Sequence, residues 1–409
     1  MRARVLIALL LIAGPARAQE PTPAQVFEAR LLPIFKSPNP SSCTQCHLAG
    51  VDLKNYLRST HEQTFVALRD QGMIDLDVPE KSKILAFIRR GADDKGADLI
   101  LQKNRSAEFE ALKDWIVRSV RDPKLRALPA ETAKAVSPPV EVIRHARTDH
   151  LVESYANTIW ALRFRCMSCH IEGSDENRKL VEKHGPRVAW FKAGGPKESL
   201  EYLISKQDRL INVDDPAKSL LLQKPLAINV KHGGGKKMIV GDQGYRTFLA
   251  FLEDFARIKK GAYKSAESLP KSDVRARFGT DIWLKLTDTP PAWGDKLLLV
   301  DVYAWDAKAA AWERAPIASS DRVVWGGGKL WQHNLTLSAE TGSERAKRWQ
   351  ERGPSLAAGK YLVKVYVDAA GRVAEQGAAA MLAAGEGEVE STWPTGYGRM
   401  TVLDARRVK

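Results

Sequence analysis

Two copies of a five-residue motif hold all four cysteines of the chain. The first copy is Cys43-Thr44-Gln45-Cys46-His47, and the second is Cys166-Met167-Ser168-Cys169-His170. Cys-x-x-Cys-His is the attachment signature of c-type haem. Each thiol can form a thioether to one haem vinyl group, and the histidine then ligates the iron. The sequence therefore predicts two covalently attached haems, with attachment at Cys43, Cys46, Cys166 and Cys169 and with His47 and His170 as iron ligands.

Paired cysteines have two other common uses, and both fit this chain less well. A thioredoxin-like pair needs no adjacent histidine, and a four-cysteine zinc site gives no reason for a histidine after both pairs. Because the two motifs use every cysteine of the chain, we expect no structural disulfide.

The N-terminus has the features of a bacterial export signal. Arg2 and Arg4 precede an apolar stretch from Val5 to Ala13, and Ala16-Arg17-Ala18 is a small-x-small cleavage site. We therefore expect residues 1–18 to be removed and the mature chain to begin at Gln19. Haem attachment in bacteria takes place outside the cytoplasmic membrane, so we expect a periplasmic protein. No later segment approaches the roughly 18 apolar residues of a membrane span, so we also expect the mature protein to be soluble.

The chain is basic, with a formal net charge of +14. Such a charge can steer acidic redox partner proteins toward the surface, although a solvated basic surface without a specific partner is the simpler alternative. Nucleic acid is not an expected partner, because the protein is predicted to be exported and its Lys and Arg residues are not gathered in a binding motif.

Composition divides the mature chain into three blocks. Residues 20–121 and 140–258 each hold one haem motif, and a proline-containing connector, residues 122–139, separates them. Each of these blocks ends in an amphipathic helix, so we expect two mainly α-helical cytochrome c-like domains. Residues 274–409 contain short strand patterns with Gly and Pro between them, which predicts an all-β, sandwich-like domain.

The two haem blocks look like copies of one unit. The segments from Met73 to Leu85 and from Leu210 to Leu222 share the pattern Pro-x-Lys-Ser-x-x-Leu. The closing helix of the second block should begin at Asp242, an N-cap residue type. The apolar faces of the two closing helices are Phe109, Leu112, Ile116 and Val120 in the first block, and Tyr245, Phe248, Leu249, Leu252 and Phe255 in the second.

The third block has two clear strand patterns, Lys296 to Trp305 and Lys360 to Asp368, and the second leads to a turn at Gly371. Eight of the eleven Trp residues also lie in this block, at positions 283, 293, 305, 312, 325, 331, 349 and 393. Core packing is the favoured interpretation, because aromatic side chains dominate core energetics. A face that binds carbohydrate or a protein partner is the alternative.

The second haem needs a ligand on its far side, and His232-Gly233-Gly234-Gly235 offers one. Glycines let the backbone approach a flat group closely, and this segment lies just before the closing helix. We predict His232 as the distal ligand. Met238 is the rival, because methionine also ligates haem iron in cytochromes.

The first block has no counterpart of His232. Its corresponding stretch, Arg90 to Asn104, contains neither His nor Met. Within the block the candidates are His61 and Met73, and from the following segment they are His145 and His150. The first haem is therefore ligated by one of these four residues or has an open coordination position.

The second block resembles a group of exported c-type cytochromes from planctomycete-like bacteria. The similarity covers both haem blocks and is strongest between Val142 and Ala256. The segments that carry it are Arg163 to His170, Ser219 to Leu226, His232 to Gly235 and Gly241 to Tyr245. The resemblance implies an exported haem protein and says little about substrate.

These patterns favour an electron carrier over an enzyme: a periplasmic dihaem cytochrome whose irons cycle between Fe(II) and Fe(III). A dihaem peroxidase is the first alternative, although no acid–base pair for peroxide cleavage is recognisable. A haem protein that binds polysaccharide or a partner through residues 274–409 is the second. We assign no catalytic residue.

Overall fold

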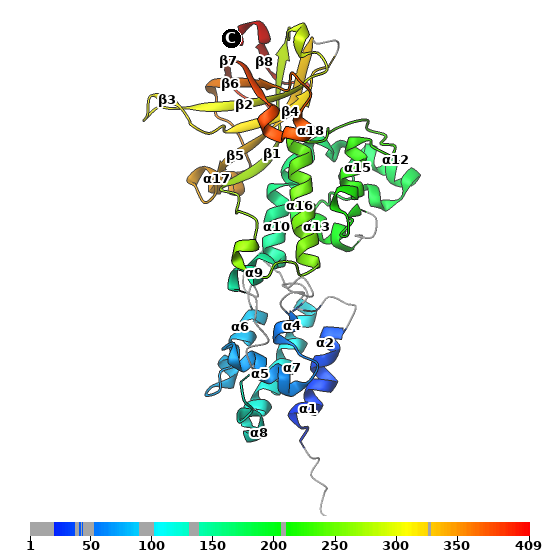
Figure 1. Ribbon diagram of the computed structural model, residues 1–409, viewed down its shortest axis with the longest axis vertical. Helices are drawn as coiled ribbons and strands as arrows, with labels where there is room; N and C mark the ends of the chain where they lie inside the picture. Colours follow the sequence, from blue (N-terminus) through cyan, green and yellow to red (C-terminus); the bar gives the residue numbers. More distant parts are fainter. Residues whose placement is uncertain are drawn as a thin grey trace, which may run out of the picture. The chain divides into compact units, whose positions relative to one another are not determined.

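A computed structural model describes residues 20–36, 41, 43, 53–89, 102–130, 139–205, 210–325 and 329–409 (Figure 1). The chain forms two compact units, one made of the described residues up to 130 and the other of those from 139 onward. The predicted signal peptide lies outside the described residues, as do Cys46 and His47 of the first haem motif.

The first unit is helical. Its longest helix, α7, buries Phe109, Leu112, Ile116 and Val120, which confirms the predicted apolar face. The elements of this unit are α1 (Pro23–Val26), the π-helix η1 (Phe27–Leu31), α2 (Leu32–Lys36), α4 (Leu53–Tyr56), α5 (His61–Asp70), the 3-10 helix η2 (Pro79–Lys81), α6 (Lys83–Arg89), α7 (Gln102–Arg121) and α8 (Pro123–Arg126).

The second unit begins with a further set of helices. Asp242 caps helix α16, because its side chain accepts a hydrogen bond of 2.6 Å from the Tyr245 backbone N–H, and this confirms the predicted start. The helices are α9 (Val140–His145), α10 (Thr148–Asn157), η3 (Trp160–Arg165), α11 (Met167–His170), α12 (Asp175–His184), η4 (Pro186–Val188), α13 (Pro196–Ser205), η5 (Pro216–Lys218), α15 (Leu220–Leu226), α16 (Gln243–Lys259) and η6 (Ala266–Ser268). Among the described residues, no helix is both long and apolar enough to cross a membrane.

The remaining residues of this unit build one mixed sheet. Its order is β7-β6-β2-β4-β5-β1-β8, with β3 paired to β2. Neighbouring strands are antiparallel except β1 and β8, which are parallel. The strands are β1 (Arg275–Thr287), β2 (Leu297–Asp306), β3 (Ala311–Trp312), β4 (Ala318–Val323), β5 (Leu330–Glu340), β6 (Gly359–Val367), β7 (Leu382–Ser391) and β8 (Thr401–Asp404), with short helices η7 (Pro291–Trp293), α17 (Glu344–Arg352), α18 (Val373–Gln376), η8 (Gly377–Ala380) and η9 (Ala405–Arg407) between or after them.

The sheet curls until its two edges approach each other. Backbone hydrogen bonds of 2.9 and 3.0 Å link Glu386 on β7 with Lys409, the residue that ends the chain after β8. The result is a nearly closed, barrel-like sheet around one core (Figure 1). The prediction of a sandwich was therefore wrong, because the strands do not divide into two facing layers.

The prediction of two cytochrome c-like domains was also wrong. The helices after residue 139 do not form a separate small domain, since they pack on the barrel and belong to the same compact unit. Arg165, which ends η3, makes a buried ion pair of 2.7 Å with Asp321 on β4. Arg277 on β1 also donates a hydrogen bond to the Thr247 hydroxyl of helix α16. The apolar pattern of residues 140–258 predicted helices correctly, but such a pattern does not say which other element the apolar side of a helix packs against.

The two predicted strand patterns are confirmed as β2 and β6, and Gly371 lies in a turn with a φ of +69°. The tryptophans of this region divide between core and surface. Trp331, Trp349 and Trp393 are buried, as predicted. Trp305 and Trp325 are 49% and 63% exposed, so these two side chains do not stabilise the core.

The predicted duplication is visible as a repeated local structure. In the first unit, Ser82 directly follows the 3-10 turn η2, and its buried hydroxyl accepts a hydrogen bond from the backbone N–H of Asp75. In the second unit, Ser219 directly follows η5, and its buried hydroxyl accepts the equivalent hydrogen bond from the backbone N–H of Asn212. The Pro-x-Lys-Ser pattern thus forms the same turn twice, each time leading into a seven-residue helix, α6 or α15.

Candidate functional site

The second Cys-x-x-Cys-His motif forms a single helical turn, α11, with Cys166 at its N-cap. The backbone N–H groups of Cys169 and His170 both donate to the Cys166 carbonyl. These bonds bring the backbones of Cys166 and Cys169 together within one turn. The Asn177 side-chain amide donates to the Cys169 carbonyl and ties the turn to helix α12.

His170 is held in one orientation by a neighbouring loop. Its Nδ1 lies 2.8 Å from the Val188 carbonyl oxygen, which can only accept, so Nδ1 carries the proton and Nε2 is left with a free lone pair. The Phe191 backbone N–H donates to the His170 carbonyl, and the Glu172 backbone N–H donates to the Phe191 carbonyl, so the segment after Val188 is fixed beside the motif. Burial and the nearby His232 lower the pKa of His170, which favours the neutral imidazole that a metal requires.

His232 lies in the loop between α15 and α16 and is oriented in the same way. Its Nδ1 lies 2.7 Å from the Gly235 carbonyl oxygen, so its Nε2 is also free to ligate. Gly235 has a φ of +70°, which closes the turn, and a Cβ at Gly234 would lie only 3.3 Å from the His232 ring. The backbone N–H of Lys237 donates to the Pro225 carbonyl and anchors the loop on α15.

The structure brings the rings of His170 and His232 together. Their centroids are 6.2 Å apart and their planes differ by 11°. Two imidazoles on opposite faces of one iron hold their bonded nitrogens about 4 Å apart, because each metal–nitrogen bond is about 2 Å long, and the ring centres are then about 6 Å apart. The spacing, the free Nε2 atoms and the hydrogen-bonded Nδ1 atoms all fit a pair of axial haem ligands.

The thiols of this motif fit covalent attachment. Cys166 and Cys169 are free cysteines, and both are partly buried. Burial raises the pKa of the Cys166 thiol to about 11, so this thiol is protonated at neutral pH.

Met238, the rival distal ligand, is only 2% exposed and belongs to the hydrophobic core of this region. The structure therefore places Met238 in a packing role.

The motif is joined to the barrel by a buried charge cluster. Arg165, directly before Cys166, pairs with Asp321, and the other Asp321 oxygen accepts from the Gln243 backbone N–H at 2.6 Å. Asp242 is buried beside this pair, and burial together with Asp321 raises its pKa to about 7.

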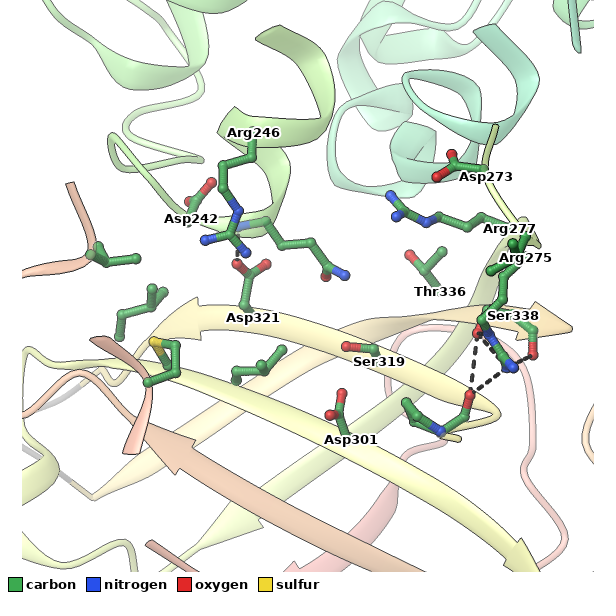
Figure 2. Close-up of a pocket in the computed structure, with 17 residues that line it drawn as sticks. Asp242, Arg246, Asp273, Arg275, Arg277, Asp301, Ser319, Asp321, Thr336 and Ser338 are labelled. Carbon is green, nitrogen blue, oxygen red and sulfur yellow. Dashed lines mark hydrogen bonds between the residues drawn. The ribbon is translucent and has the colours of Figure 1, made fainter. Parts of the chain in front are cut away.

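A cavity of about 380 Å³ lies next to this cluster, between the start of α16 and the outer face of the barrel. Asp301 is one of the residues that line it (Figure 2).

The first haem motif is described at Cys43 only, so its geometry stays a prediction. The two distal candidates of the first unit are described. His61 begins helix α5 and pairs through Nε2 with Glu62 at 2.9 Å. Met73 is partly buried against the core of the unit. Both side chains therefore already make contacts within the unit.

The other two distal candidates lie in the second unit and contact each other there. The rings of His145 and His150 are 4.3 Å apart, and His145 Nε2 lies 2.8 Å from a carboxylate oxygen of Asp254. No sequence motif pointed to Asp254, because it is 109 residues from His145 and lies within helix α16. The one sequence feature that marked Asp254 was its place as a charged residue among the apolar residues of that helix.

The remaining histidines, His184 and His333, lie apart from both Cys-x-x-Cys-His motifs. His184 is exposed at the end of helix α12, and His333 is buried in the barrel with its Nδ1 2.7 Å from the Ser320 hydroxyl.

No protein-family model matches this chain, and comparisons with curated proteins and with solved structures detected no similar protein.

Proposed function

We propose that this chain is a periplasmic c-type cytochrome that transfers electrons, with Cys166 and Cys169 as haem attachment sites and His170 and His232 as axial ligands. The observation that carries the proposal is the near-parallel pair of imidazoles at 6.2 Å, each held by a backbone carbonyl. Bis-histidine ligation leaves no open position for substrate, so it favours electron transfer over catalysis.

Several features of the surroundings support the assignment. Trp190 lies 5.8 Å from His170, and Cys166 and Met167 pack against the apolar core of the unit. Lys224 is close enough to lower the pKa of His170, and such a cation can pair with a haem propionate. A haem bound here would supply an iron that gains and loses one electron, and the protein would set its potential through ligands and burial.

We extend the proposal to a second haem at Cys43, Cys46 and His47, on the motif alone. The protein would then be a dihaem electron carrier whose partners are other redox proteins. The formal net charge of +14, of which Arg2, Arg4 and Arg17 lie in the predicted signal peptide, leaves a basic mature chain and supports acidic partners, which a basic surface attracts over a distance.

Haem content tests the proposal. The purified protein should contain two haems by mass and by the pyridine haemochrome spectrum. Cys166→Ala with Cys169→Ala should contain one, and so should the matched variant Cys43→Ala with Cys46→Ala. A protein without covalent haem, or double variants that keep both, would contradict the proposal.

Electron paramagnetic resonance tests the ligands. Near-parallel imidazole planes give a rhombic low-spin ferric signal, and the Cys43/Cys46 variant isolates the haem at Cys166 for this measurement. A high-spin signal from that variant, or a spectrum typical of perpendicular rings, would exclude the ligand pair that we propose.

A further inference from the structure

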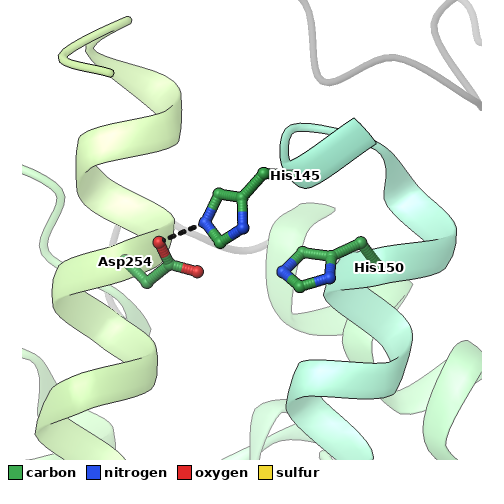
Figure 3. Close-up of side chains that lie close together, drawn as sticks. All are labelled: His145, His150 and Asp254. Atoms are coloured by element: carbon green, nitrogen blue, oxygen red, sulfur yellow. Dashed lines mark hydrogen bonds and ion pairs between the residues drawn. The ribbon is translucent and has the colours of Figure 1, made fainter. Parts of the chain in front are cut away.

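A second group of metal-binding side chains lies apart from the haem motif in sequence. His145 ends helix α9, His150 lies on helix α10 and Asp254 lies on helix α16, and the three side chains point toward one another (Figure 3). One ligand atom from each residue lies within 4.8 Å of the other two. Three separate helices therefore deliver two imidazoles and one carboxylate to one point.

The spacing is close to that of a metal site. Ligand atoms around a zinc ion lie about 3 to 3.5 Å apart, because their bonds to the metal are about 2.1 Å long. His145 and Asp254 are already 2.8 Å apart, and the third ligand atom is within 4.8 Å of both. Small rotations of side chains would complete the set without moving a helix.

The surroundings also match a metal site. The Tyr263 hydroxyl donates a hydrogen bond of 2.6 Å to the same Asp254 oxygen that pairs with His145. Metal-binding carboxylates are commonly oriented by such an outer hydrogen bond. The side chains of His145 and Asp254 are 10% and 11% exposed, so the group is shielded and an ion can still enter from solvent.

We infer that His145, His150 and Asp254 form a binding site for a divalent transition metal ion of the zinc class. Two histidines and one carboxylate are a known ligand set for zinc, with a fourth position left for water. An ion bound at His145 Nε2 would replace the hydrogen bond between that nitrogen and Asp254, and a proton on Nε2 would move to Nδ1 of the same ring or to solvent. The inference does not depend on the haem proposed at Cys166, because it uses none of the residues assigned to that haem.

Zinc binding to the full-length, haem-loaded protein tests the inference. After equilibrium dialysis against Zn²⁺, elemental analysis should find one more zinc per chain in the wild type than in His150→Ala or Asp254→Asn. The X-ray absorption spectrum of the zinc-loaded wild type should show imidazole ligands. Tyr263→Phe should keep the site but weaken it by about 10- to 100-fold, the usual effect of losing an outer hydrogen bond.

His184→Ala is the matched control, because it removes an exposed histidine at the end of helix α12. This variant should bind as much zinc as the wild type. Circular dichroism shows whether each variant is folded, and Zn²⁺ should raise the melting temperature of the wild type but not that of folded His150→Ala. Equal zinc content in the wild type and in folded His150→Ala and Asp254→Asn would overturn the inference.

Discussion

Arg165 and Asp321 form a buried ion pair of 2.7 Å, 156 residues apart in sequence, that joins the Cys166 turn to the barrel. Both side chains are almost fully buried, with 2% and 3% exposed. The residue that precedes Cys166 is thus fixed by strand β4, so the Cys166 turn is positioned by the sheet as well as by its own helices.

Removing one partner of this pair should destabilise the second unit. Asp321→Ala leaves the Arg165 charge buried without its partner, and such changes cost about 3–5 kcal/mol of unfolding free energy. Chemical denaturation measures the loss. Lys360→Gln is the control, because its partner Glu388 and Lys360 itself are 47% and 61% exposed, and exposed pairs contribute about 0–1 kcal/mol. Equal losses in the two variants would contradict the role of the buried pair.

His232→Ala should keep its haem but change the spin state of the iron. The two thioethers do not involve His232, so covalent haem content should equal that of the wild type, while the loss of a nitrogen ligand should convert one haem to a high-spin form. Optical spectroscopy and paramagnetic resonance measure the change. His184→Ala should leave both spectra unaltered, and an unaltered spectrum of His232→Ala would rule out this ligand.

The carboxyl group of Asp301 should make stability depend on pH. Burial raises its pKa from 3.8 to about 6, so the folded state binds this proton more tightly than the unfolded state. The resulting stabilisation is complete below about pH 4 and is lost as pH rises through about 6, with a total of about 2–3 kcal/mol.

Asp301→Asn removes this titration. The unfolding free energy of the variant minus that of the wild type should therefore increase as pH rises from about 4.5 to about 7.5. Denaturant titrations at several pH values measure this difference. Asp295→Asn, a change at an exposed position, should follow the wild type at every pH. A constant difference between Asp301→Asn and the wild type would contradict the prediction.

The duplicated turns should respond alike to the same substitution. Ser82→Ala and Ser219→Ala each leave a backbone N–H, that of Asp75 or Asn212, without its acceptor. An unsatisfied buried donor costs about 1–3 kcal/mol, so both variants should lose a similar amount in denaturation. Ser205→Ala, at an exposed position, should lose less. A large loss for one serine and none for the other would show that the turns are not equivalent.

Local patterns predicted the local elements well. The apolar face of α7, the cap at Asp242 and the alternation in β2 and β6 depend on neighbouring residues, and all three were recognisable in the sequence. The approach of His232 to His170 was suggested by the glycines beside it.

Long-range contacts were not predictable in the same way. The parallel pairing of β1 with β8 joins residues more than 100 positions apart, and no turn between them marks it. The Arg165–Asp321 pair and the His145–Asp254 contact likewise depend on how helices and sheet pack together. Of these contacts, the Arg165–Asp321 pair joins the second set of helices to the barrel.

The first haem should have the weaker distal ligand. The stretch of the first block that corresponds to His232 contains neither His nor Met. His61 pairs through Nε2 with Glu62, Met73 packs in a core and His145 pairs through Nε2 with Asp254. Ligation of iron by Met73, or through the Nε2 atom of either histidine, would therefore break an existing contact. An iron without a firmly bound sixth ligand takes up carbon monoxide, whereas one closed by two histidines does not.

Carbon monoxide titration of the fully reduced protein separates the two sites. The wild type should bind one equivalent, the Cys43/Cys46 double variant none, and His232→Ala two, because each substitution removes or opens one haem. His184→Ala should bind one equivalent like the wild type. Zero equivalents in the wild type would mean that both irons are closed, which would exclude the peroxidase alternative and leave electron transfer at both haems.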